Sequence, residues 1–184
     1  MEPTGKPQSD EILDLATRRR REKEVVNVEV EQTLIVVFCL HRQPPTDGSE
    51  GFYGLPAAAV ESIVHPEQIT FVPGTPPWIL GVINVRGEIE SVLDLKAVLG
   101  LGRSEITPET RLLIAQDGDL RSGLLVDQVV DIAPFAPDAI GPAPTPLEGG
   151  RGVYIAGETT YADETLLILD LSQVFHRALE TDSV

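Results

Sequence analysis

Cysteine is almost absent from the sequence: the 184-residue chain carries one, Cys39. No disulfide framework can form within a single copy. Cys39 lies inside the apolar run 33–40, which favours a buried thiol over a nucleophile or a metal ligand.

Long apolar runs are also missing, since no stretch approaches the roughly eighteen residues that a membrane span requires. The start, Met1-Glu2-Pro3-Thr4-Gly5, shows no basic region followed by an apolar one, as a secretory signal would. We therefore expect a cytoplasmic protein without direct membrane insertion.

Basic residues are few: 14 Lys and Arg stand against 29 Asp and Glu, a formal net charge of -15. A polyanion would be repelled by most of this surface, so nucleic-acid binding is not expected. Residues 1–24 are balanced, with six basic and six acidic side chains, so residues 25–184 carry the whole excess.

Recognisable catalytic patterns are lacking as well. His41, His65 and His176 show no metal-binding spacing, and neither a phosphate-binding loop nor a dinucleotide fingerprint occurs. Asp94 and Asp170 each follow an apolar strand pattern and precede a helical one, where an aspartate caps the helix. We predict that the protein is not an enzyme and needs no cofactor or metal.

What the chain does have is a series of short runs rich in Val, Ile, Leu and Thr between turn residues, which predicts a mostly β fold. Asp117-Gly118 is a hairpin signal, and the segments 43–51 and 134–152 have loop composition. We expect helices at 95–99 and 171–179, with a further helical signal at 76–80, and strands at 33–40, 68–72, 82–85, 88–93, 111–116, 120–126 and 164–169.

A weak internal repeat organises these elements into two halves. Gly54-Leu55, Val60 and Ile63 recur sixty-nine residues later, and Gly81, Glu88, the Leu-Asp-Leu of 93–95 and Val98 recur seventy-six residues later, in the same order. Two copies that are each too small to bury their own apolar faces suggest two similar antiparallel barrels around a joint core, with a groove between them.

The segment from Gly81 to Glu88 places a lone cation, Arg86, in a turn of an acidic body. Asn84 and Gly87 supply the turn chemistry, and Arg86 supplies five donors on a long arm. The second half has Tyr161-Ala162-Asp163 at this point, so the repeated scaffold does not require Arg86. A partner contact is favoured; the alternative is that Arg86 fixes its own loop.

At this point the sequence resembles the CheW-like domain family. The resemblance rests on Asn84-Val85-Arg86-Gly87 after Gly81, on Leu93-Asp94-Leu95, and on Gly123-Leu-Leu-Val-Asp127 with Val129. It covers roughly residues 32–179. It implies an all-β fold of two similar five-stranded β-barrel subdomains that share a hydrophobic core, with short helices including a C-terminal one.

The resemblance further implies a non-catalytic adaptor that couples chemoreceptor tips to a CheA-type histidine kinase. The receptor's helical hairpin is expected in the groove between the barrels, and the kinase's own CheW-like domain is expected to pack end to end on a barrel. The matching partner-binding positions are Arg86, Gly81, Gly87, Asn84, Val60 and Val129.

Two departures from the family pattern affect these expectations. Ser62 stands where the family commonly has a glutamate, with Glu61 displaced by one, and the loop at 43–51 is longer than usual. We divide the chain into an N-terminal extension at 1–31, flexible or a short helix, an interleaved two-barrel domain at 32–180 and a tail at 181–184. Two alternatives stay open: a ligand-binding or catalytic groove, and an adaptor of pili-based or developmental signalling.

Overall fold

The computed structural model describes residues 32–41, 50–144 and 148–179. The predicted extension at 1–31, most of the predicted loop at 43–51 and the predicted tail at 181–184 lie outside the described residues. Cys39 is buried at 3% exposure, as expected. In the part of the chain that is described, no helix has the length and apolar character to cross a membrane.

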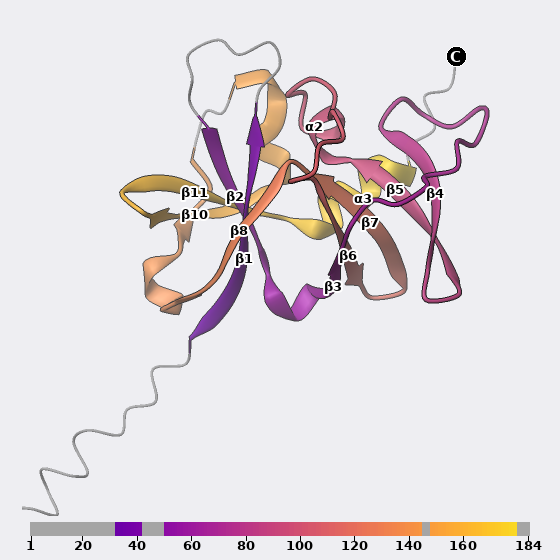
Figure 1. Cartoon of the computed structure of the whole chain (residues 1–184). Coiled ribbons are helices and arrows are strands. Elements are labelled where there is room, and N and C mark those ends of the chain that lie inside the picture. Colours follow the sequence, from indigo (N-terminus) through magenta and orange to yellow (C-terminus); the bar gives the residue numbers. More distant parts are fainter. Residues whose placement is uncertain (1–31, 42–49, 145–147, 180–184) are drawn as a thin grey trace, which may run out of the picture. The chain divides into compact units, whose positions relative to one another are not determined.

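Short strands dominate the described residues, and only brief helices interrupt them (Figure 1). In chain order the elements are β1 (Thr33–His41), β2 (Glu50–Pro56), η1 (Ala57–Ala59), β3 (Val60–Val64), β4 (Ile79–Val85), β5 (Glu88–Asp94), α2 (Leu95–Val98), β6 (Arg111–Asp117), β7 (Leu120–Val126), β8 (Gln128–Phe135), η2 (Pro137–Ala139), β9 (Gly141–Pro142), η3 (Glu148–Tyr154), β10 (Ile155–Tyr161), β11 (Glu164–Leu169) and α3 (Leu171–Leu179).

The strands form two sheets built on one plan. The first sheet has the order β8-β1-β2-β11-β10-β9 and the second has the order β3-β6-β7-β5-β4. In each, one central pair is parallel, β2 with β11 and β7 with β5, and the remaining pairs are antiparallel. The predicted all-β fold of two similar halves is confirmed; the first sheet carries one further strand, the two-residue β9.

The sequence repeat and the sheets divide the chain differently. The first repeat supplies β1 to β5 and α2, and the second supplies β6 to β8, β10, β11 and α3. With the short β9 set aside, each sheet takes two strands from one repeat and three from the other. The described chain therefore crosses between the sheets twice, at η1 and at Asp127, the single residue between β7 and β8. The halves exchange strands and cannot be separated.

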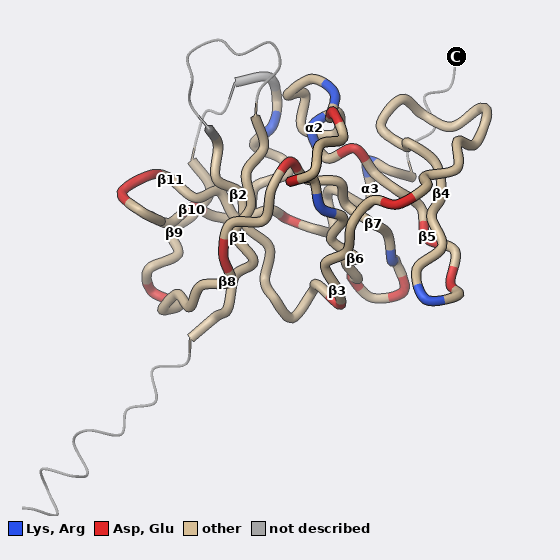
Figure 2. Tube along the Cα trace, viewed as in Figure 1, with Lys and Arg blue, Asp and Glu red and all other residues tan. Residues whose placement is uncertain are grey.

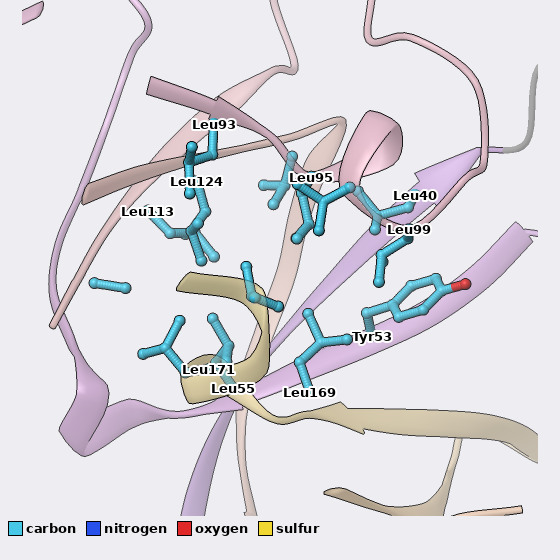
Figure 3. Packing of buried hydrophobic residues seen from close by; sticks show 14 of the residues in the cluster. Leu40, Tyr53, Leu55, Leu93, Leu95, Leu99, Leu113, Leu124, Leu169 and Leu171 are labelled. Atoms are coloured by element: carbon cyan, nitrogen blue, oxygen red, sulfur yellow. The ribbon is translucent and has the colours of Figure 1, made fainter. Parts of the chain in front are cut away.

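Apolar faces of both sheets meet in one joint core (Figure 3). Leu55 from the first sheet and Leu93, Leu113 and Leu124 from the second are at most 1% exposed. Leu171 and Val174 of α3 pack into the same cluster. Full burial of one such side chain is worth about 1.5–3 kcal/mol, so this joint core is the largest stabilising feature of the fold.

The two helices begin at aspartate caps, as predicted. The Asp94 carboxylate accepts from the backbone N–H groups of Lys96 and Ala97 at 3.1 and 3.3 Å. Asp170 accepts from the backbone N–H of Gln173 at 3.2 Å. These contacts occupy the first orphan amides of each helix and leave both carboxylates with a structural role.

Several local predictions were wrong. Residues 68–72 form no strand, and only Thr70 makes an isolated bridge to Val82. The possible helix at 76–80 is a turn that leads into β4. The segment 134–152 includes the end of β8, η2, β9 and most of η3. Pro134 suggested a loop, but prolines are tolerated on edge strands, and β8 is an edge.

Gly81 is explained by a close backbone approach. Its φ is +144°, and a Cβ built there would lie 2.1 Å from the carbonyl oxygen of Thr70. The register of β4 on β5 shifts at this point, as in a β-bulge. Gly157, its counterpart in the second half, would bring a Cβ to 2.6 Å from the Gly141 carbonyl oxygen. The repeat preserves glycine here because both sheets receive an extra segment against this strand.

We predict that Gly81→Ala lowers the free energy of unfolding by on the order of 2–3 kcal/mol, because the backbone must move to admit the methyl group. The control is Gly118→Ala, at φ +58° with no neighbour within 4 Å, which should cost only about 1 kcal/mol. Urea denaturation of both variants measures the difference, and equal losses would contradict the close-approach explanation.

Candidate partner-binding surface

The turn between β4 and β5 has the geometry of a tight two-residue hairpin. Val85 pairs with Glu88, and the two central residues, Arg86 and Gly87, have φ values of 56° and 96°. Positive φ at both positions is typical of a type I′ turn. The Asn84 side-chain oxygen accepts from the Gly87 backbone N–H at 2.8 Å. Asn84 and Gly87 therefore have clear roles in forming the turn.

Arg86 has no such role. Its side chain is exposed, and within the described residues no hydrogen bond or ion pair is made by its guanidinium. The alternative in which Arg86 fixes its own loop therefore finds no supporting contact. The equivalent turn between β10 and β11 has Ala162 and Asp163 at φ values of 49° and 66°. An alanine makes the same turn, so the backbone does not call for an arginine.

The predicted site residues separate into three places. Asn84, Arg86 and Gly87 lie together at the tip of the β4–β5 hairpin, while Gly81 is buried further along β4. Val60 and Val129 are half-buried against the joint core, on β3 of the second sheet and β8 of the first. The structure thus brings three of the six together, and contact of all six with a partner stays a prediction.

Val60 and Val129 lie at the start of two matching edge strands, as the first residue of β3 and the second residue of β8. Both strands carry a bulge: the register of β3 on β6 shifts between Val60 and Ser62, and that of β8 on β1 shifts beside Val129. The extra residues are Glu61 and Val130. Beyond the bulges, Ile63 and Ile132 face Leu113 and Val36, which belong to the joint core. The edge strands β3 and β8 therefore have the same backbone arrangement.

The side chains of the two edge strands, β3 and β8, differ. In the first sheet an exposed apolar group, which we name the β8 edge patch, consists of Leu34, Val130, Ile132 and Pro134; the first three are 50%, 41% and 50% exposed. At the matching places the second sheet has Arg111, Glu61, Ile63 and His65. Three of these four positions are polar, so the apolar character of the β8 edge patch is not required by the repeated fold.

The sequence reasoning missed the β8 edge patch because it compared the halves for what they share. The signal was available in the sixty-nine-residue offset, which places Val130 opposite Glu61 and Pro134 opposite His65. A segment with proline near its end was instead interpreted as the start of a loop.

Glu61 is held by a cluster of charges in the second sheet. Arg121 on β7 donates from Nε to Glu61 at 2.8 Å and from Nη1 to Glu88 at 2.6 Å, and it also pairs with Glu90. Partial desolvation lowers the pKa of Arg121, but the bonds to Glu61 and Glu88 and the charge of Glu90 outweigh it, so the pKa is raised. The guanidinium stays charged, and Glu61 has a partner within its own sheet.

Acidic residues are spread along the trace, with few basic ones between them (Figure 2). In the described chain Lys96, Arg111 and Arg121 make polar contacts through their side chains, and Arg177 stacks on Trp78 with 4.0 Å between its Cζ and the ring centroid. Arg86 and Arg103 lack such contacts among the described residues. Arg86 is therefore an available cation on a strongly acidic protein.

The alternative of a ligand-binding or catalytic groove required two histidines beside Asp94 or Asp170. His41 instead contacts Asp127, and the His65 ring lies 3.4 Å from an Arg111 nitrogen. Both aspartates cap helices. Across residues 32–41, 50–144 and 148–179, no three His, Cys, Asp or Glu side chains are placed to hold a metal ion. The geometry that would have favoured this alternative is not found there.

Comparison with known proteins is consistent with the fold. Residues 45–179 match the CheW-like domain family. The chain is 33% identical to chemotaxis protein CheW of Bacillus subtilis over 132 residues, covering 72% of this chain and 85% of that protein. It is 32% identical to protein PilI of Pseudomonas aeruginosa over 106 residues, covering 58% and 60% of the two.

A solved structure has a similar fold. The crystal structure of the scaffolding protein TtCheW from Thermoanaerobacter tengcongensis superposes with a TM-score of 0.70 at 30% identity, covering 86% of this chain and 94% of that one. The similarity thus extends over both sheets and is not limited to one motif.

We predict that Arg86→Gly raises stability by about 0.5 kcal/mol, because glycine adopts a positive φ without the steric cost of a side chain. Ala162→Gly, at the matching turn, is the control and should gain a similar amount. Thermal unfolding should show Tm rising by roughly 1–2 °C in each. A loss of stability on Arg86→Gly alone would mean that Arg86 holds the fold together.

Proposed function

This chain belongs to the CheW-like domain family, and from that membership we propose that it couples the cytoplasmic helical hairpin of a chemoreceptor to a CheA-type histidine kinase. Members of the family are non-catalytic scaffold proteins, and this chain is accordingly a scaffold of chemotaxis-type signalling and not an enzyme. The proposal concerns the two partners and the surfaces that bind them.

Arg86 carries the proposal. It is exposed, it occupies a strained backbone position that alanine fills in the other half, and the described residues leave its guanidinium without a partner. The turn accounts for the backbone conformation in both halves, so what sets Arg86 apart is its exposed guanidinium and not its positive φ. An arginine fork suits a carboxylate on the partner, which it can bind through two parallel hydrogen bonds.

The β8 edge patch supports a second contact. Exposed apolar side chains grouped on an edge strand invite association, and proteins usually cover or charge such edges. Arg86 lies in the second sheet and the β8 edge patch in the first. Two surfaces of different chemistry on different sheets suit a protein that holds two partners at once, the receptor hairpin by helix-in-groove binding and the kinase through its CheW-like domain.

We further propose that the protein works in the cytoplasm and joins receptor arrays at the membrane through the receptor. Relatives named as chemotaxis proteins and as protein PilI both match the chain. The proposal therefore concerns the coupling of receptor to kinase, and it applies equally to chemotaxis and to pili-based signalling.

We expect Arg86→Glu to weaken capture of the receptor or the kinase at least tenfold, which is about 1.4 kcal/mol, with Tm nearly unchanged. The test is a pull-down from native lysate with the purified chain, followed by titration of the recovered kinase and receptor. Ala162→Glu and Arg103→Glu are controls for the turn and for the added negative charge.

Both control variants should bind as the wild type does. If Arg86→Glu bound the partners as tightly as the wild type does, Arg86 would not be part of the binding site. Recovery of neither a CheA-type kinase nor a receptor by the wild type would overturn the proposed function.

A separate prediction concerns the β8 edge patch. Ile132→Asp puts a charge in the centre of the patch and should weaken binding of one of the two partners by about tenfold, because an apolar contact cannot solvate a carboxylate. Ile132 is half exposed, so Tm should change little. Thr165→Asp, an exposed position on β11 of the same sheet, is the control; equal binding by both variants would exclude the patch.

A further inference from the structure

Asp127 stands where the chain passes from one sheet to the other. It is the single residue between β7, in the second sheet, and β8, in the first. The other crossing, η1, has three residues, all alanine. A one-residue link leaves little freedom in the backbone, and here its side chain also makes contacts.

The Asp127 carboxylate connects both sheets. One oxygen accepts from the His41 backbone N–H at 2.7 Å and lies 3.0 Å from Nδ1 of the His41 ring, at the end of β1 in the first sheet. The Lys96 ammonium donates to both oxygens at 3.1 and 3.2 Å. Lys96 belongs to α2, which continues from β5 of the second sheet.

Stability alone does not explain this bridge. The side chain of Lys96 is 2% exposed and that of Asp127 is 11% exposed. Removing two charges from water costs much of what their attraction returns, so a buried ion pair contributes little net free energy of folding. Either charge buried without the other is costly, so such a pair disfavours arrangements that would separate the two groups.

The second half has a related contact that involves a hydroxyl in place of the ammonium. Ser172, seventy-six residues after Lys96, donates from α3 to Asp117 at the end of β6. On α3, Arg177 also stacks on Trp78, which precedes β4. Each helix follows a strand of one sheet and is connected to the other sheet: α3 bonds to Asp117 at the end of β6, and α2 bonds to Asp127, which in turn bonds to His41 at the end of β1. Only the Lys96–Asp127–His41 bridge uses an ion pair and lies at a crossing.

We propose that Asp127 is a positioning residue: with Lys96 and His41 it holds the two sheets at a fixed angle, so that the surfaces on each can engage their partners at the same time. The claim that both partners are engaged at the same time rests on the proposed function. The claim that the bridge holds the sheets at a fixed angle does not depend on it. Neither Arg86 nor the β8 edge patch touches the bridge, so each surface stays intact when the bridge is removed.

The test removes both charges together with Lys96→Met and Asp127→Asn, which keeps an acceptor for the His41 backbone N–H. Spin labels on Asp119→Cys, in the turn between β6 and β7 of the second sheet, and on Thr165→Cys, in β11 of the first, report the distance between the sheets. Cys39 is 3% exposed and is not labelled in the folded protein. We expect the distance distribution to broaden about twofold while Tm stays within about 4 °C.

The matched control is Arg121→Gln with Glu90→Gln, which removes the Arg121 ion pairs, all of them within the second sheet. Its distance distribution should equal that of the wild type. If the double variant at 96 and 127 does not fold, Asp127→Asn alone is measured in the same way. An unchanged distribution in a folded variant would overturn the positioning role.

Partner binding provides the second measurement. The variant should bind the kinase domain and the receptor hairpin separately with affinities within about twofold of the wild type, and should form the three-part complex about tenfold less well. An equal yield of that complex would overturn the link to coupling. If the wild type binds neither partner, the proposed function fails, and the spin-label distances still decide whether Asp127 positions the sheets.

Discussion

The burial of two sheets against one joint core is the constraint on which the rest of the structure depends. Leu55 comes from one sheet and Leu113 and Leu124 from the other, and none of them is solvent-exposed. Each sheet also buries a smaller apolar cluster of its own, around Ile35 in the first sheet and around Leu112 in the second, but the joint cluster is the largest. The exchange of strands, the two short crossings and the placement of α3 over the core all serve that burial.

A repeated interior leaves the exterior free to differ between the halves. Positions that face the core or shape the backbone are matched, including the glycines at 81 and 157 and the caps at 94 and 170. Exposed positions are not: Arg86 stands opposite Ala162, and Val130 opposite Glu61. Since identical halves would present identical surfaces, the proposed binding of two different partners requires such differences, and these positions are the candidate contacts.

The basic side chains differ in the same way between internal contacts and exposed positions. Arg121 neutralises part of a three-glutamate cluster within one sheet, and Lys96 meets Asp127 where the chain passes between sheets. Both of these cations make ion pairs within the protein. Arg86 is held at a hairpin tip by a turn that Asn84 and Gly87 make, and its guanidinium is turned to solvent. On a body with net charge -15, that exposure makes it a distinctive feature for an acidic partner.

The sequence by itself determined the β class, the two-part repeat, both aspartate caps and the strands at 120–126 and 164–169. It also showed that Arg86 has no counterpart in the other half. These features depend on local patterns and fixed offsets. The sequence did not reveal β2, β3, β8 or β10, whose glycines, prolines and polar residues look local but are paired by distant strands. Only the tertiary structure decided which repeat supplies which sheet, that Glu61 is bound by Arg121, and that Asp127 joins His41 to Lys96. Those contacts span sixty, eighty-six and thirty-one residues, and no local pattern specifies a pairing made by chain segments so far apart.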